Sequence, residues 1–161
     1  MDNNSRPRME SRRAARNHVF NIIFQCEFSG VDEIEDTLKN YYEVLRDEVE
    51  EEKKDDPEYE ELVINEEFVN KAVFGISENI EDIDRIIGEN TKGWKVERLA
   101  KVDLAILRIA VYEMKYDDDI PNQVAINEAV EMAKKYGEKK SSSFINGILG
   151  AINRKIDGGV I

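Results

Sequence analysis

The sequence predicts an all-α fold of about seven helices in two packed helical bundles, and three observations support this. Apolar residues recur every three or four positions along most of the chain, the spacing of one helix face. Pro121 and Gly137 stand where a helix should begin and end. No segment of useful length alternates apolar and polar residues as a half-buried strand does. We expect one domain over residues 11–156, with an N-terminal bundle at about 11–80 and a C-terminal bundle at about 81–156.

The first helix is expected to begin after Ser11, whose side chain suits the N-cap position, and to run to about Phe28. Residues 1–10 contain Pro7 and arginines and have no apolar periodicity. We therefore expect a flexible basic arm over residues 1–10. The apolar face of the first helix consists of Ala15, Val19, Ile22, Ile23 and Cys26.

A second long helix leads into a strongly acidic segment. Residues 46–61 contain ten acidic and three basic side chains, and Pro57 interrupts any helix that extends into them. Because so many like charges repel one another and cannot enter a core, we interpret residues 46–61 as a solvated insertion or loop. The apolar face of the second helix consists of Ile34, Leu38, Tyr41, Leu45 and Val49.

Two shorter helices follow the acidic segment. Asn65 suits the N-cap of the third helix, and Gly88 or Gly93 should end the fourth. Trp94 and Leu99 come next, and we expect both in the core because they bring large apolar areas. The apolar positions are Phe68, Val69, Ala72, Val73 and Ile76 in the third helix and Ile80, Ile83, Ile86 and Ile87 in the fourth.

The last three helices follow one another closely. Pro121 suits the first turn of the sixth helix, where its missing N–H costs nothing, and Gly137 suits its C-terminal end. The seventh helix should start at about Ser142 behind a serine cap, and the glycines inside it, Gly147 and Gly150, indicate close approach of a neighbouring helix. The expected apolar stripes are Leu104, Leu107, Ala110, Val111 and Met114, then Val124, Ala125, Ala129, Met132 and Ala133, then Phe144, Ile145, Ile148, Leu149 and Ile152.

The composition excludes several classes of function. His18 and Cys26 are the only histidine and cysteine, so a histidine zinc site, a catalytic triad and an internal disulfide are excluded within one chain. We find no phosphate-binding loop and expect no catalytic residue, metal or cofactor. No apolar run reaches the roughly 18 residues of a membrane helix. The N-terminus lacks an apolar secretory core, so we place the protein in the cytoplasm with no membrane partner.

The net charge of −12 argues at first against nucleic acid, because an acidic surface repels phosphates. However, the charge is unevenly distributed. Residues 46–61 carry a net −7, whereas the first sixteen residues hold five arginines against two acids, a net +3. Residues 134–155 hold six basic residues and one acid, a net +5. The protein is acidic overall but has two basic ends.

Each basic end is a candidate RNA-binding site. The arginines at the start of the first helix supply charges for phosphate contacts, although a solubilising tail has the same composition. Lys139 and Lys140 precede three serines and Phe144. Lysines beside hydroxyls and an aromatic ring provide the phosphate contacts and stacking face used in single-stranded RNA recognition. At its helical spacing, Phe144 also fits the core.

Four segments carry a family resemblance: RRAARNHVFNIIFQCEF, VDLAILRIAVYEM, IPNQVAINEAVEMAKKYG and SSSFINGILG. Together they resemble the NusB family of bacterial transcription antitermination factors, over nearly the whole chain outside the acidic segment. The resemblance implies an all-helical fold of two bundles and pairing with the small-subunit ribosomal protein NusE. It further implies that the pair binds the single-stranded boxA segment of ribosomal RNA leader transcripts and helps RNA polymerase resist termination. Homodimers and monomers both occur in the family, so a homodimer is one implied state.

The resemblance also implies site residues. Phe24 stands where many members have tyrosine, so it can stack on a base but lacks the hydroxyl. Asp103 occupies an acidic position that implies a surface facing NusE or the adjoining RNA. The acidic segment is a second departure, which would weaken nonspecific RNA binding or contact another partner. The implied RNA-binding residues are Arg12, Arg13, Arg16, Phe24, Lys139, Lys140, Ser141, Ser143 and Phe144.

We predict a non-enzymatic RNA- and protein-binding factor that acts in transcription antitermination. One alternative is the RNA-binding helical domain related to ribosomal RNA cytosine methyltransferases. We see no methyl-donor-binding domain or catalytic cysteine motif, so this alternative would require a truncated chain. The other is a helical adaptor or homodimer that binds only proteins, and the arginines of the first helix count against it.

Overall fold

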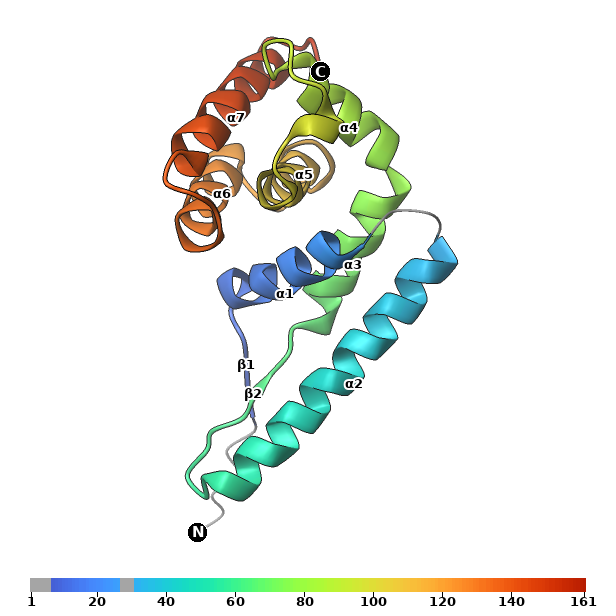
Figure 1. Ribbon diagram of the computed structural model, residues 1–161, viewed down its shortest axis with the longest axis vertical. Coiled ribbons are helices and arrows are strands. Elements are labelled where there is room, and N and C mark those ends of the chain that lie inside the picture. Colours follow the sequence, from blue (N-terminus) through green and yellow to red (C-terminus); the bar gives the residue numbers. More distant parts are fainter. Residues whose placement is uncertain (1–6, 27–30) are drawn as a thin grey trace.

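The computed structural model describes residues 7–26 and 31–161 and has an all-helical architecture (Figure 1). Seven α-helices account for most of this part of the chain, which confirms the predicted fold class. The helices are α1 (Arg12–Gln25), α2 (Val31–Asp55), α3 (Glu66–Glu78), α4 (Ile80–Glu89), α5 (Lys101–Tyr116), α6 (Asn122–Tyr136) and α7 (Ser141–Asp157). A short 3-10 helix (Val96–Arg98) and two strands, β1 (Arg8–Met9) and β2 (Leu62–Val63), are the remaining elements.

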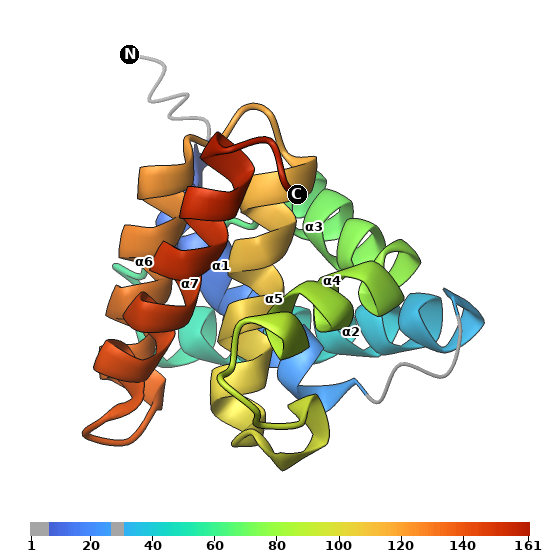
Figure 2. The ribbon, with the colours of Figure 1, turned by 90° about the horizontal axis from the view of Figure 1, so that it is seen from above.

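Helix α5 is the centre of the molecule. Ten of its sixteen residues are buried, more than one face can supply, as is typical of a helix enclosed on several sides. It packs against α1 and α3 as well as α4, α6 and α7, and Figure 2 shows it between the α6–α7 pair and α3. Its Ile106, Leu107 and Ile109 are among the fully buried side chains of the core. Because α5 contacts helices from both halves of the chain, it joins them into one core, and the predicted bundle boundary near residue 80 stays a prediction.

The acidic segment is helical over most of its length, where we expected an insertion or loop. Helix α2 continues through it as far as Asp55. Its charged side chains are exposed, as expected for a solvated segment, while Leu45 packs against the core on the opposite face. In the last turn of the helix, the Lys53 ammonium lies 2.7 Å from a carboxylate oxygen of Glu61, which follows the helix. The charge of this segment favours a loop, but packing of the apolar face of α2 against the core stabilises the helix, which therefore continues into it.

The strands β1 and β2 form a small parallel ribbon beside the distal half of α2 (Figure 1). Arg8 pairs with Leu62 and Met9 with Val63. Residues that we assigned to the basic arm are therefore hydrogen-bonded to the segment that follows α2. Two-residue strands are too short to alternate visibly, so periodicity could not reveal them.

Several predicted helix ends are confirmed. The Ser11 hydroxyl accepts a hydrogen bond from the Ala14 N–H at 3.1 Å, and α3 is capped in the same way by Asn65. Helix α1 ends at Gln25, earlier than expected, and the predicted stop at residues 29–30 lies outside the described residues. Helix α7 begins at Ser141 with Lys140 at its N-cap, so the predicted serine cap is wrong.

Gly137 ends α6 as predicted, and packing explains why this residue is glycine. Its φ of −90° and ψ of −178° are open to any residue. A Cβ atom would lie 2.6 Å from the Ser141 Cβ and 2.8 Å from the Ala133 carbonyl oxygen. Gly147 is the opposite case, since a Cβ there would meet no atom within 4 Å. The prediction of a close helix approach at Gly147 is therefore wrong, and the close contact occurs instead at Gly137, in the turn between α6 and α7.

Replacing Gly137 with alanine should lower the free energy of unfolding by about 1–3 kcal/mol, because the α6–α7 turn must shift to admit the methyl group. The matched substitution Gly147→Ala should raise it by about 0.5–1 kcal/mol, since alanine restricts the unfolded chain and favours a helix. Urea unfolding monitored by circular dichroism measures both. Equal effects at the two positions would contradict the packing argument.

Two expected core residues lie at the surface. Trp94 is 58% exposed, whereas Leu99 is buried as predicted. Trp94 follows a turn in which Lys92 and Gly93 have positive φ, and its carbonyl accepts a hydrogen bond from the Thr91 hydroxyl. The turn thus holds the backbone by its own hydrogen bonds and leaves the indole outside. Val124, in the first turn of α6, is also exposed.

Candidate nucleic-acid interface

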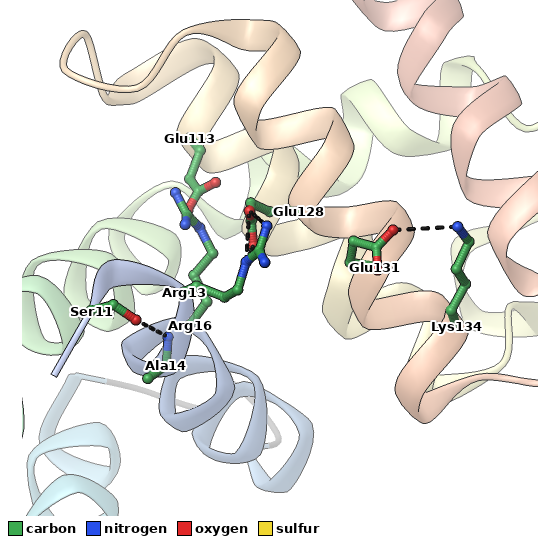
Figure 3. Close-up of polar contacts among 8 residues, drawn as sticks. All are labelled: Ser11, Arg13, Ala14, Arg16, Glu113, Glu128, Glu131 and Lys134. Carbon is green, nitrogen blue, oxygen red and sulfur yellow. Dashed lines mark hydrogen bonds and ion pairs between the residues drawn. The ribbon is translucent and has the colours of Figure 1, made fainter.

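Arg12 and Arg13 are exposed at the start of α1, as an RNA-binding role requires. The Arg13 side chain is 73% exposed, and its Nη2 donates to Glu128 Oε1 at 2.9 Å (Figure 3). The hydrogen bond that Arg13 donates to Glu128 raises the pKa of Arg13, so the guanidinium stays charged. Ion pairs this exposed contribute little to stability, and an RNA phosphate can compete for the arginine.

Arg16 lies on the same helix but points inward. Its side chain is 5% exposed, and its Nε lies 2.6 Å from Oε1 of the buried Glu113 in α5 (Figure 3). Its guanidinium carbon also lies 5.4 Å from the ring centre of Phe68. Arg16 therefore has no access to an RNA phosphate in this structure, and the role implied by the resemblance is corrected to one of holding α1 on α5.

Burial changes the ionisation of Glu113. Loss of hydration raises the pKa of this carboxyl to about 7, and the attraction of Arg16 opposes the rise without cancelling it. The pair therefore links the packing of α1 on α5 to pH.

Phe24 is the exposed end of a stack of aromatic rings. It is 45% exposed and stacks on Phe20 at 5.8 Å between ring centres. Phe20 stacks in turn on Tyr136 of α6 at 4.3 Å, and the Lys135 ammonium lies 5.0 Å from the Tyr136 ring centre. An exposed ring that is held in place by a stacked neighbour is suited to stacking against an unpaired base.

The α6–α7 junction presents only part of the predicted second patch. Lys139, Lys140 and Ser143 are exposed. Ser141 is buried, and its hydroxyl accepts a hydrogen bond from the Glu138 N–H at 3.0 Å. Phe144 is half-buried and packs against the core. The lysines and Ser143 can meet an RNA strand, whereas Ser141 and Phe144 chiefly support the turn.

Contacts between α1 and α6 bring the two basic regions together. The Tyr136 hydroxyl donates to Asn17 Oδ1 at 2.9 Å, and Arg13 binds Glu128 one helix away. The loop with Lys139 and Lys140 directly follows Tyr136. Residues more than one hundred positions apart are thus in contact, and a joint RNA-binding surface over the two basic regions stays a prediction.

A separate groove of about 600 Å³ lies where the end of α1 meets α4 and α5. Phe24 and Leu104 line it with apolar surface. At its rim Arg108 Nη2 donates to Asp84 Oδ2 at 2.8 Å. Asp103, the predicted partner-binding residue, is nearly buried in the first turn of α5 and is not part of the lining. Its Oδ1 has no hydrogen-bond partner among the described residues, an arrangement that costs stability unless a partner is supplied.

The match to known proteins extends over this whole arrangement. The model of the NusB family matches residues 13–154. The chain belongs to the NusB family. It is 44% identical over 140 residues to the transcription antitermination protein NusB of Clostridium botulinum (strain Kyoto / type A2), covering 87% of this chain and 97% of the relative. The resemblance read from the four segments is thereby confirmed.

Solved structures agree with the family assignment. A crystal form of T. maritima NusB superposes with a TM-score of 0.71 at 34% identity, covering 91% of this chain and 93% of that one. A structure of the antitermination factors NusB and NusE in complex with double-stranded RNA superposes with a TM-score of 0.68 at 24% identity, covering 89% and 96%. At that identity the second likeness shows the fold alone.

No group of three or more histidine, cysteine, aspartate or glutamate side chains among the described residues is placed to hold a metal ion. None of the described helices is long and apolar enough to cross a membrane.

Proposed function

We propose that the chain is a transcription antitermination factor that binds single-stranded boxA RNA together with NusE, within the antitermination complex of RNA polymerase. It acts in the cytoplasm by binding and not by catalysis. The observation that carries this proposal is the exposure of cations at the start of α1 and at the α6–α7 junction on a protein of net charge −12. Exposed cations attract the phosphates of RNA, whereas the acidic remainder of the surface repels them. RNA binding is therefore favoured along the cations, which we call the RNA track, and disfavoured elsewhere.

The exposed side chains have two different roles in RNA binding. Arg12 and Arg13 supply phosphate contacts on α1, and Lys139 and Lys140 supply them at the junction. Phosphate contacts give affinity without sequence information, whereas stacking and base-edge contacts give selectivity. Phe24 offers the stacking face, because its partner ring Phe20 holds it in place.

NusE is assigned to the groove between α1, α4 and α5. The groove begins at Phe24, so a protein seated there adjoins the RNA track. Asp103 lies in the same first turn of α5 as the lining residue Lys101, with a carboxylate oxygen that lacks a partner. Because that oxygen is buried, a basic or hydroxyl group of NusE can reach it only if the first turn of α5 shifts on binding. The joint surface would then read the RNA better than either protein alone.

The test is a titration with boxA RNA and a scrambled RNA of equal length, with NusE present, at several salt concentrations. We expect boxA to bind at least about tenfold more tightly at moderate salt, since base contacts persist when phosphate contacts are screened. Equal affinity for the two RNAs would refute the proposed function.

A further inference from the structure

A second groove lies on the other flank of α1, between α1 and α2. Its volume is about 730 Å³, and the family features described above do not use it. Four of its lining side chains are carboxamides, Asn17, Asn21 and Gln25 from α1 and Asn40 from α2. Such a concentration of amides at a groove is unusual in a chain whose polar surface is mostly charged.

These amides have hydrogen-bonding capacity to spare. Gln25 and Asn40 are exposed, with no side-chain hydrogen bond among the described residues. Asn21 Nδ2 makes only a long bond of 3.4 Å to the Tyr41 hydroxyl, and Asn17 accepts from Tyr136 while its amide donors stay available. Each carboxamide can donate and accept at once.

The groove walls are fixed. His18 Nδ1 lies 2.7 Å from the Tyr41 hydroxyl, and its Nε2 lies 3.1 Å from Oε2 of the buried Glu10. This chain ties β1, α1 and α2 together and orients the Tyr41 ring at the groove wall. Val44 of α2 adds an apolar surface that is 57% exposed. Flat apolar surface beside amide donors and acceptors matches a nucleobase, which is apolar on its faces and polar along its edge.

The lining argues against a phosphate ligand. Among the described residues no lysine or arginine lines this groove, whereas Glu48 does. The exposed cation Arg13 lies at the N-terminal end of α1, where it contacts Glu128 of α6. Helix α1 is therefore a ridge that carries this cation at its start and, farther along, the amides that line the α2 side. A single strand that follows the ridge can place its phosphates toward α6 and turn its bases toward α2.

The register along α1 supports this path. Arg13, Asn17, Asn21 and Gln25 follow one another at intervals of four residues, so they lie along one stripe of the helix. The stripe is roughly 18 Å long, since a helix rises about 1.5 Å per residue. It begins at the arginine and ends beside the exposed ring of Phe24.

We infer that the α1–α2 groove is a base-reading subsite for single-stranded RNA, in which Asn21 and Asn40 contact the edges of unstacked bases. The inference rests on the proposed function, because the same strand must bind the cations of α1 and the α6–α7 junction. Asn21 and Asn40 would then provide sequence selectivity, although neither residue belongs to a charged cluster or a recognised motif.

The test uses the full chain with NusE and compares Asn21→Ala/Asn40→Ala with the unaltered protein on boxA and scrambled RNA. We expect the preference for boxA to fall by about five- to 100-fold, the range for lost bidentate base contacts. The salt dependence of affinity should not change, because no phosphate contact is removed. The exposed amide Gln123 of α6 serves as a control, and Gln123→Ala should leave the preference intact.

Two further measurements guard against a folding artefact. Asn40→Leu changes one exposed side chain to an apolar one of similar size. This single substitution should by itself lower the preference for boxA RNA. In NMR spectra of the unaltered protein, the side-chain amide signals of Asn21 and Asn40 should shift when boxA RNA is added. An undiminished preference in both variants overturns the subsite while the proposed function stands. Absence of any boxA preference in the unaltered protein overturns both.

Discussion

Replacing Arg16 with alanine should lower the free energy of unfolding by about 3–5 kcal/mol at pH 8, among the largest losses expected of any single substitution in this chain. The substitution leaves Glu113, which is 2% exposed, without its counter-ion in the centre of the fold. It also removes the contact of the guanidinium with Phe68. Arg13→Ala is the matched control, since it breaks an exposed ion pair on the same helix and should hardly change stability. Chemical denaturation at fixed pH measures both.

The loss should depend on pH. Burial raises the pKa of Glu113 to about 7 from its ordinary 4.5. A carboxyl with a raised pKa in the folded state stabilises the fold fully below pH 4.5, and that contribution is lost as pH rises through about 7. Arg16→Ala should therefore cost less at pH 5, where Glu113 carries a proton, than at pH 8. Glu113→Gln cannot ionise and should remove this part of the pH dependence. A pH-independent loss in Arg16→Ala would contradict the assignment.

The contrast between Arg13 and Arg16 shows that charge alone does not distinguish an exposed binding residue from a buried structural one. Three arginines within five positions look equivalent as a basic cluster. However, Arg16 is spaced three, four and seven residues from Val19, Phe20 and Ile23, which places it on the buried face. Helical periodicity, applied to charged residues as well as apolar ones, would have identified it. The buried partner could not have been predicted, because Glu113 is 97 positions away in the chain.

Helices with strong apolar stripes were predicted well, because an amphipathic face and its caps are local properties. Features that apolar periodicity does not reveal account for the misses. The β1–β2 ribbon depends on pairing across more than fifty residues, and Trp94 is left outside by the hydrogen bonds of its own turn. The α1–α2 groove was missed because Asn21 and Asn40 are unremarkable until two helices bring them together.

Removing the four exposed cations of the RNA track should have the largest effect on binding. The variant Arg12→Ala/Arg13→Ala/Lys139→Ala/Lys140→Ala should bind boxA RNA about 100-fold more weakly at physiological salt. Its slope of log affinity against log salt should flatten by about three, since each phosphate contact with a single strand contributes about 0.7. Stability should change little, because all four side chains are exposed. Fluorescence anisotropy with labelled RNA across a salt series measures both quantities.

The fourfold variant makes an acidic protein still more acidic. A control must therefore separate the effect of net charge from the effect of the positions of the four cations. The control Lys39→Ala/Lys54→Ala/Lys95→Ala/Arg98→Ala removes four exposed cations from α2 and the α4–α5 connection and produces the same net charge. We expect it to weaken binding only slightly, with an unchanged slope, because those charges lie off the track and are largely screened. Equal losses in the two variants would mean that long-range attraction, not contact along α1 and the junction, governs RNA binding. Unequal losses with unequal slopes place the phosphates beside Arg12, Arg13, Lys139 and Lys140.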